Sequence, residues 1–481
     1  MFFLRCAQKP LQLLGTLQYY FDCSGTPIAY NGCGLIEFLR VKVVAFKIGL
    51  LGLGTVGAGT AEILLSPDGR HPLLQELEIY RVGVRDISRT RSLQLPENVL
   101  TTDLEAIATD PEIDIVVELI GGLEPARSLI LQAIASGKHV VTANKAVIAR
   151  YGNEIFEAAN KKGVYVMLEA AVGGGIPVIQ SLKQSLGANR IQTVTGIVNG
   201  TTNYILTRMQ TEGADFAEVL ADAQQLGYAE ADPTADVDGL DAADKIAILA
   251  SLAFGGRIKL ADVHCEGIRK VSAADIDYAD KLGFVIKLLA IAQETTGYNG
   301  KQAEGESELL SIRVHPTFVP KTHPLASVNG VYNAILVEGE PIGQLMLYGR
   351  GAGAGPTASA VVSDIMNVAA ILKSQAVPTP HPLLSCSHQH YCKIAPMQEL
   401  VTRFYARFLT RDTPGVIGKL GTCFGNHKVS LESVVQTGIH GDLAEIVVVT
   451  HDVREGNFQQ ALDEIRAMDA VDSIASTLRV L

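Results

Sequence analysis

A single lysine, Lys245, follows a segment crowded with carboxylates: Glu230, Asp232, Asp236, Asp238, Asp241 and Asp244. Asp241 and Lys245 are four residues apart, so their side chains share one face if the segment is helical. The apolar residues after Lys245 predict a buried helix that would hold this face in place. A lysine fixed among carboxylates can donate a proton to an oxygen that develops negative charge, and the remaining carboxylates can bind an ammonium group.

Two simpler interpretations of this segment compete with the catalytic one. The first ligand positions of a calcium-binding loop are matched by Thr234, Asp236, Asp238 and Gly239. The last position of such a loop needs a bidentate glutamate, however, and here it holds Lys245. The other interpretation is a solvated acidic turn with an ordinary helical ion pair, which is common and weak. The segment alone does not separate this turn from a catalytic site.

The composition narrows the class of protein. A length of 481 residues predicts about three domains. The chain is 47% hydrophobic and 19% charged, with 46 glycines, which is typical of a globular α/β protein. A net charge of −11 argues against a nucleic acid or an anionic membrane as partner, and no apolar run is long enough to span a membrane. Seven cysteines, an odd number, indicate free thiols and a cytoplasmic location.

The first 45 residues differ from the rest of the chain. They hold Cys6, Cys23 and Cys33, and they show no clear periodicity. The segment is aromatic-rich and not notably rich in arginine or serine, which disfavours a transit peptide. We expect either that translation starts near residues 41–44 or that this leader is a disordered extension.

A glycine-rich turn in the expected setting follows the leader. Residues 44–51 predict a buried strand, residues 58–65 predict a helix, and between them lie Gly52, Leu53, Gly54, Thr55, Val56 and Gly57. This G-x-G-x-x-G turn lets the backbone approach a pyrophosphate, and the helix N-terminus attracts the phosphates. The next predicted strand, 77–84, ends at Arg85 and Asp86. Arg85 favours NADP, with NAD still possible, unless it is an ordinary solvated arginine.

The alternation of strands and helices continues after this turn. Residues 113–119 and 139–143 predict strands, and residues 124–136 predict the helix between them. Gly121 follows the first of these strands, and Lys145 follows the second. The carboxyl ends of such strands bind ligands, so Lys145 could serve the nicotinamide, the substrate or proton transfer. A solvated lysine at the start of a helix is the competing interpretation.

A second glycine-rich loop lies further along the chain. A predicted strand, 164–168, is followed by Glu169, by three consecutive glycines and by Pro177, which opens a helix. Exposed carbonyl groups beside Glu169 could bind a hard cation. A plain glycine-rich turn is the alternative.

Taken together, these segments resemble the homoserine dehydrogenase family. The residues that carry the resemblance are Gly52 to Gly57, Gly121-Gly122 with Glu124 to Ala126, Thr142 to Lys145, Glu169 to Pro177, Asn199 to Tyr204, Gly227 to Lys245 and Gly349 to Ala358. The resemblance runs from about residue 47 to the C-terminus, and only the leader departs from it.

The resemblance implies the reversible reduction of L-aspartate 4-semialdehyde to L-homoserine by NAD(P)H, on the route to threonine and methionine. It makes Lys245 the proton donor to the carbonyl oxygen, with Lys145 as a second candidate that also lies near the cofactor. It makes Glu230 and Asp241 the residues that hold the substrate.

The resemblance also implies positions for the cofactor and for a cation. Gly121, Gly227 and Gly355 resemble positions near the cofactor. A site for a monovalent cation such as Na⁺ or K⁺, bound mainly by backbone carbonyl groups, is implied at Glu169, Val172, Gly174 and Ile176.

The C-terminal part predicts a connector and a small regulatory module. Residues 371–400 contain Cys386-Ser387-His388-Gln389-His390-Tyr391-Cys392, whose spacing matches no usual structural zinc site, so we expect an exposed linker. The strands and helices predicted from residue 403 onward are 403–410, 414–425, 428–436, 443–450, 455–467 and 470–480, a ferredoxin-like βαββαβ unit. Its first strand–helix turn, with Asp412 and Gly415, resembles ACT domains, which bind amino acids and commonly pair. Feedback by threonine near these two residues is implied.

We therefore expect an α/β protein of several domains. The expected units are the leader (1–45), a Rossmann domain (46–172, with 345–370 returning to it), an α+β substrate and dimerisation domain (173–344), the linker (371–400) and an ACT domain (401–481). We expect a homodimer or homotetramer. A dehydrogenase of another amino-acid semialdehyde and a catalytically silent amino-acid or nucleotide sensor are the alternatives.

Overall fold

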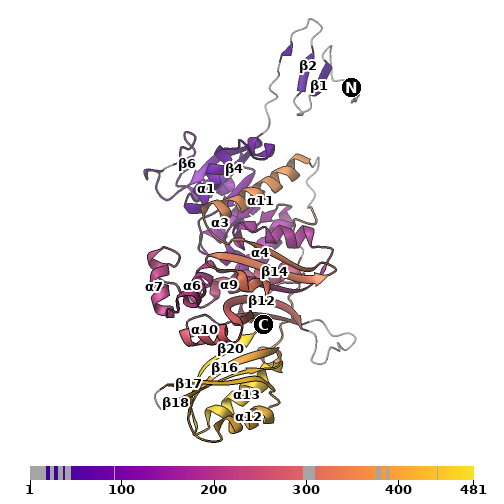
Figure 1. The fold of residues 1–481 in the computed structure, drawn as a ribbon. Helices are drawn as coiled ribbons and strands as arrows, with labels where there is room; N and C mark the ends of the chain where they lie inside the picture. The colour runs from indigo at the N-terminus through magenta and orange to yellow at the C-terminus, as the bar shows by residue number, and fades with distance from the viewer. Residues whose placement is uncertain are drawn as a thin grey trace, which may run out of the picture.

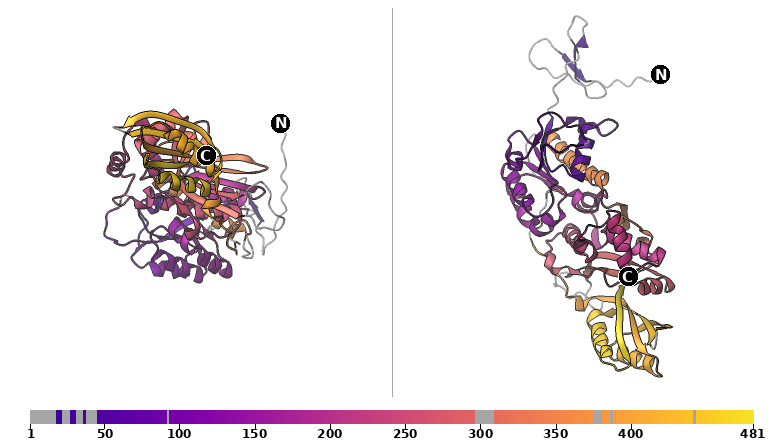
Figure 2. Two further views of the ribbon diagram at one scale, coloured as in Figure 1. Left: turned by 90° about the horizontal axis from the view of Figure 1, so that it is seen from below. Right: turned by 90° about the vertical axis from the view of Figure 1, so that its left-hand side faces the viewer.

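The protein is seen in a computed structural model, which shows a row of three domains (Figures 1 and 2). The residues that the structure describes are 18–21, 27–30, 36–37, 45–91, 93–295, 309–374, 381–385, 388, 390–440 and 443–481. In the leader, β1 (Gln18–Phe21), β2 (Pro27–Tyr30) and β3 (Ile36–Glu37) pair into a small antiparallel sheet, which the sequence did not predict.

The first domain is built on a parallel sheet with the strand order β6-β5-β4-β7-β8-β9. Its strands are β4 (Phe46–Leu51), β5 (Leu77–Gly83), β6 (Leu100–Thr101), β7 (Ile115–Glu118), β8 (His139–Thr142) and β9 (Val166–Met167). The central strands are continuous apolar runs because helices cover both faces of the sheet. The strand order reverses between β4 and β7, which is where ligands of such sheets bind. The predicted Rossmann domain is confirmed.

Helices from two distant parts of the chain cover this sheet. They are α1 (Thr55–Leu65), α2 (Leu104–Thr109), α3 (Ala126–Ala135), α4 (Lys145–Lys162) and α11 (Ala354–Ser374). Helix α11 packs so closely on α1 that a Cβ atom at Gly59 would lie 3.0 Å from the carbonyl oxygen of Ala354. By length and composition α11 could cross a membrane, but here 56% of its most apolar stretch is buried inside the molecule.

The second domain is an antiparallel sheet with helices on one face. Its strand order is β15-β14-β10-β12-β13, and the strands are β10 (Arg190–Ile197), β12 (Phe284–Thr295), β13 (Leu309–Pro320), β14 (Tyr332–Glu340) and β15 (Gly343–Arg350). The helices include α6 (Gly200–Glu212), α7 (Phe216–Gln225), α8 (Thr234–Val237), α9 (Leu240–Phe254) and α10 (Ala273–Lys281). Helix α9 packs on both α4 and the sheet, so it bridges the first two domains.

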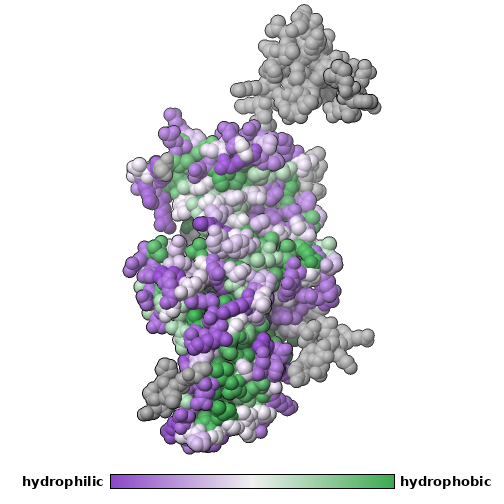
Figure 3. Space-filling view, viewed as in Figure 1, coloured by the Kyte–Doolittle hydropathy of each residue, from purple (hydrophilic) through white to green (hydrophobic). Residues whose placement is uncertain are grey.

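The third domain has the predicted βαββαβ order. Its elements are β16 (Val401–Arg411), α12 (Val416–Asn426), β17 (Leu431–His440), β18 (Leu443–Thr450), β19 (Val453–Arg454), α13 (Glu455–Arg466) and β20 (Val471–Val480). Strand β20 pairs in parallel with β13, so the sheets of the second and third domains form one continuous sheet. Hydrophobic side chains reach the surface over this end of the molecule (Figure 3). Val401 and Val434 are exposed residues of the third domain.

The connector before the third domain is bound to the second domain and is not a free linker. The backbone of Arg257 exchanges hydrogen bonds with His390 and Cys392, and the backbone of Leu310 does the same with Lys393 and Ala395. Of the predicted Cys/His motif, Cys386, Ser387 and Gln389 lie outside the described residues.

Candidate active site

Asp241 and Lys245 lie on one buried face of α9, as their spacing predicts. The helix begins after Gly239, whose φ of +82° is a left-handed conformation that favours glycine. Lys245 Nζ lies 2.7 Å from Asp241 Oδ2, and it donates a second hydrogen bond of 2.6 Å to the carbonyl oxygen of Val198. Its side chain is only 11% exposed, so the solvated-turn interpretation does not describe this pair.

Lys145 reaches the same carboxylate from the first domain. It is the first residue of α4, directly after β8, and its Nζ lies 3.0 Å from Asp241 Oδ1. Its side chain is 38% exposed, whereas that of Asp241 is 9% exposed. Two ammonium groups from two domains therefore share one buried carboxylate at the carboxyl end of the parallel sheet.

Attraction between opposite charges shifts the pKa values of Asp241 and Lys145. Burial alone would raise the pKa of Asp241, but the ammonium groups of Lys245 and Lys145 outweigh it and hold the pKa well below its usual range. Burial would likewise lower the pKa of Lys145, but the attraction of Asp241 raises it above its usual value. Asp241 is therefore ionised and Lys145 is protonated at neutral pH.

Asn199 completes the contacts of Asp241, and the sequence analysis assigned it no role of its own. Its side-chain amide donates to Asp241 Oδ2 at 2.8 Å and to Asp236 Oδ1 at 2.7 Å. Its amide oxygen caps α6 by accepting from the backbone N–H of Thr202. An asparagine followed by Gly-Thr-Thr was the available signal, because asparagine is a favoured N-cap residue. Both oxygens of Asp241 are thus engaged by side chains of the protein, so an ammonium group of the substrate would have to share them with these side chains.

A buried network fixes the start of α4, and its central residue, Glu118, was missed. Glu118 accepts a 2.6 Å hydrogen bond from the hydroxyl of Thr142, which in turn accepts from the backbone N–H of Asn144. The other carboxylate oxygen accepts from the backbone N–H groups of Ile120 and Gly121. A carboxylate at the end of an apolar strand was the available signal. The network joins β7 to β8 and to Asn144, and so it positions the next residue in the chain, Lys145.

The glycine-rich turn has the geometry that a dinucleotide needs. Gly52 has a φ of +105°, and a Cβ atom at Gly57 would lie 2.3 Å from the carbonyl oxygen of Gly52. Gly54 is the N-cap of α1 without a side-chain cap, and a Cβ there would meet no atom within 4 Å. The free N–H groups at Thr55 and Val56 and the open space at Gly54 fit a pyrophosphate.

An arginine that pairs with no carboxylate among the described residues lies just beyond the end of β5. Arg85 is exposed, whereas the neighbouring Asp86 carboxylate accepts hydrogen bonds from the backbone and hydroxyl of Ser88. Gly121, with a φ of +72°, also lies at the carboxyl edge of this sheet, directly after β7.

The conformation of the predicted cation loop depends on two of its glycines. Gly173 and Gly174 have positive φ values, and the loop lies against the backbone of Gly351. The carboxylate of Glu169 accepts from the backbone N–H groups of Ile179 and Gln180, so the residue has its carbonyl group to offer to a cation. Neutral carbonyl groups of Glu169, Val172, Gly174 and Ile176 fit a monovalent cation better than a divalent one.

Three other predicted site residues lie at the surface. Glu230, Gly227 and Gly355 are exposed, and Gly227 has a φ of +75°. Within the described part of the chain, no contact joins the Glu230 carboxylate to the two lysines; the backbone carbonyl of Glu230 accepts from Gln224.

Two cavities lie apart from the lysine pair. One of about 520 Å³ in the third domain is lined by Asp412 and Gly415, the predicted effector residues. A larger one of about 780 Å³ lies between the later turns of α4 and α9 and is lined by residues that include Arg150, Phe156 and Leu252. Lys145, Lys245 and Asp241 do not line this cavity, so we do not assign the chemistry to it.

Comparison with known proteins agrees with this geometry. The family description "Homoserine dehydrogenase, NAD binding domain" matches residues 52–169, "Homoserine dehydrogenase" matches 177–366 and "ACT domain" matches 404–470. The homoserine dehydrogenase of Synechocystis sp. is 69% identical over 436 residues, which cover 90% of this chain and 99% of that protein.

Solved structures give the same result. A homoserine dehydrogenase from Thiobacillus denitrificans is 42% identical with a TM-score of 0.81, over 91% of this chain and 98% of that one. A hyperthermophilic archaeal homoserine dehydrogenase, solved in complex with NADPH, is 27% identical with a TM-score of 0.55, over 69% of this chain and 99% of that one. With its nicotinamide dinucleotide-binding domain, its catalytic domain and its ACT domain, the chain belongs to the homoserine dehydrogenase family of oxidoreductases, which act on a CH–OH group.

Proposed function

We propose that this protein reversibly reduces L-aspartate 4-semialdehyde to L-homoserine, on the route to threonine and methionine. The observation that carries the proposal is the pair of lysines, Lys145 and Lys245, held on Asp241 at the carboxyl end of a dinucleotide-binding sheet. A solvated or merely structural ion pair would not need two ammonium groups from two domains at this edge.

The residues of the site divide the work of the reduction between them. A bound nicotinamide supplies the hydride that reaches the aldehyde carbon. Lys245 stabilises the negative charge that grows on the carbonyl oxygen and then donates a proton to it, and Lys145 is the second candidate for this step. Asp241 holds both ammonium groups in place, so little reorganisation is needed during the reaction. Glu230, together with Asp241, binds the ammonium group of the substrate.

We propose NADP as the preferred cofactor, with NAD as a possible substitute. The pyrophosphate lies at Gly52, Gly54, Thr55, Val56 and Gly57, and Gly121, Lys145, Gly227 and Gly355 lie near the rest of the cofactor. Arg85 is free to pair with the 2′-phosphate, whereas Asp86 is occupied by Ser88. The NADPH held by the archaeal relative supports the same preference.

Two further sites belong to the proposal. A monovalent cation binds to the carbonyl groups of Glu169, Val172, Gly174 and Ile176 and holds the loop that faces Gly351. Threonine binds in the cavity at Asp412 and Gly415 and inhibits the enzyme.

We propose a homodimer or homotetramer in the cytoplasm. The apolar surface over the third domain supports an oligomer (Figure 3). The described cysteines Cys265, Cys392 and Cys423 are free thiols, which fits a reducing compartment.

The test is the absorbance of reduced nicotinamide after addition of L-homoserine and NADP, then NAD, at alkaline pH. We expect homoserine-dependent reduction that falls by orders of magnitude in Lys245→Ala. Full activity in Lys245→Ala would move the proton-transfer step to Lys145. Turnover only with other substrates in a panel of amino-acid semialdehydes would favour a different dehydrogenase. Tight nucleotide binding with no turnover would favour a silent sensor.

A further inference from the structure

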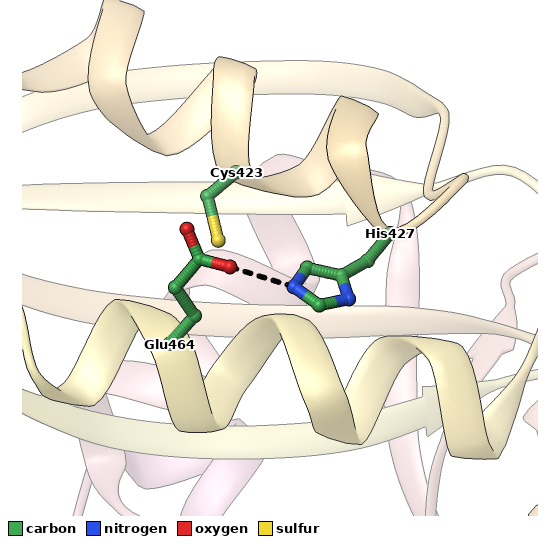
Figure 4. Close-up of side chains that lie close together, drawn as sticks. All are labelled: Cys423, His427 and Glu464. Carbon is green, nitrogen blue, oxygen red and sulfur yellow. Dashed lines mark hydrogen bonds and ion pairs between the residues drawn. The ribbon is translucent and has the colours of Figure 1, made fainter.

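The two helices of the third domain bring together three side chains that have no part in the proposed reaction. Cys423 and His427 come from the last turn of α12 and the residue after it, and Glu464 comes from the last turn of α13 (Figure 4). The Cys423 Sγ, a ring nitrogen of His427 and a carboxylate oxygen of Glu464 all lie within 4.8 Å of one another. Among the described residues, this is the one group of three or more histidine, cysteine, aspartate or glutamate side chains whose ligand atoms all lie this close together.

The three side chains are of the types that bind a thiophilic divalent cation. Thiolate, imidazole and carboxylate are the ligands of zinc, whose bond lengths place ligand atoms roughly 3 to 4 Å apart. Cys423 and His427 are four residues apart, so they share one face of α12. The carboxyl end of a helix also attracts a cation, because its unpaired carbonyl groups carry partial negative charge.

The burial of the three side chains gives a site with one open side. Cys423 is buried at 1% exposure, the His427 side chain is 23% exposed and that of Glu464 is 51% exposed. A cation would therefore bind the thiol on its buried side and have its fourth coordination position open to solvent, as in zinc sites with three protein ligands. Without a cation, His427 Nε2 pairs with Glu464 Oε2 at 2.8 Å, and Cys423 Sγ lies 3.6 Å from the carbonyl oxygen of Ala461.

We propose that Cys423, His427 and Glu464 form a binding site for a thiophilic divalent cation, best matched by zinc, which ties α12 to α13. Binding replaces the proton of the Cys423 thiol, which passes to solvent, and uses the lone pair of the His427 ring nitrogen and a carboxylate oxygen of Glu464.

The test uses the full-length protein, freed of metal with a chelator and titrated with Co²⁺. We expect one equivalent to produce the visible absorption of a cobalt–thiolate complex, and Zn²⁺ to displace it. The absorption is lost in Cys423→Ser, and Glu464→Gln weakens binding at least tenfold. Glu464 is exposed, so Glu464→Gln remains informative even if Cys423→Ser fails to fold.

The matched control is Cys392→Ser. Cys392 is a half-buried thiol that also has an imidazole, that of His390, beside it near Gly256. We expect the cobalt absorption to be unchanged in this variant. No absorption with the wild type, absorption that survives Cys423→Ser, or absorption that is lost only in Cys392→Ser would each overturn the proposal.

Discussion

At the scale of single residues, one carboxylate organises the candidate active site. Asp241 is buried, and its two oxygens face Lys145, Lys245 and Asn199. A buried carboxylate is costly unless charges and hydrogen bonds offset the loss of water, and here two ammonium groups do so. The same attraction raises the pKa of Lys145 and so keeps its ammonium group charged, and the contacts with Asp241 hold both lysines in place.

Asp241→Asn tests this organising role. Without the carboxylate, the raised pKa of Lys145 falls back, so its ammonium group loses the proton at a lower pH than in the wild type. We expect kcat to fall about 100-fold and the alkaline limb of the kcat/KM profile to move to lower pH. The comparison is Asp244→Asn, because Asp244 pairs with Arg150 and attracts Lys145 less strongly than Asp241 does, so we expect a smaller shift of the profile. An unchanged pH profile in Asp241→Asn would contradict the assignment.

Arg85→Gln tests the cofactor preference. Removal of the guanidinium should raise the KM for NADP by about 10- to 100-fold, as expected for loss of a charge-assisted contact, and leave the KM for NAD nearly constant. Arg81→Gln is the control, because Arg81 lies on the same strand and donates to the backbone of Asn98. Equal effects on the two cofactors would place the 2′-phosphate elsewhere.

At the scale of elements, glycine occurs in the turn between β4 and α1 for two different reasons: the fold requires it at one position, and ligand binding requires it at the other. Gly57 is needed by the fold itself, because any Cβ there would collide with the carbonyl oxygen of Gly52. Gly54 has an ordinary φ of −77° and open space, so the fold would accept alanine there. Space that the protein leaves open at a helix N-terminus is available to a phosphate.

The pair Gly54→Ala and Gly57→Ala tests this division. We expect Gly54→Ala to keep the melting temperature of the wild type while it loses NADP affinity, as measured by calorimetric titration. Gly57→Ala should lower both, since the collision at 2.3 Å must displace the turn. If Gly54→Ala bound NADP normally, the pyrophosphate would have to lie elsewhere.

At the scale of the whole molecule, the third domain is joined to the second by a continuous sheet and by a buried ionic network. Arg407 on β16 pairs with Asp275 at 2.9 Å and with Glu445 at 2.7 Å, and Tyr278 donates to the same Glu445. Asp275 belongs to the first turn of α10 in the second domain. A ligand that moves the third domain would therefore also shift α10 of the second domain through these contacts.

Arg407→Ala tests whether this network couples the domains. It would leave two buried carboxylates without their counter-ion, so we expect a loss of about 3 to 5 kcal/mol in the stability of the third domain. The inhibition by threonine that we propose should weaken while basal activity remains. The control is Arg466→Ala, whose exposed pair with Asp463 lies within the third domain and should contribute about 0 to 1 kcal/mol. Unchanged threonine inhibition in Arg407→Ala would show that coupling takes another route.

Local patterns of the sequence were enough to predict the Rossmann domain, the βαββαβ unit and the contact of Asp241 with Lys245. Each depends on neighbours in the chain: apolar periodicity sets strands and helices, glycine sets the turn, and a spacing of four sets a shared helix face. The sequence by itself therefore determined the class of fold and one of the two lysine contacts of Asp241.

Only the tertiary structure decided how distant segments meet. Lys145 and Asp241 belong to different domains and lie far apart in the sequence, and no local pattern predicts that α4 and α9 pack together. The same holds for Glu118, whose role depends on strand β8 lying beside β7, and for the union of the second and third sheets through β13 and β20. These contacts follow from burial and chain crossing over the whole molecule, which act between residues far apart in sequence.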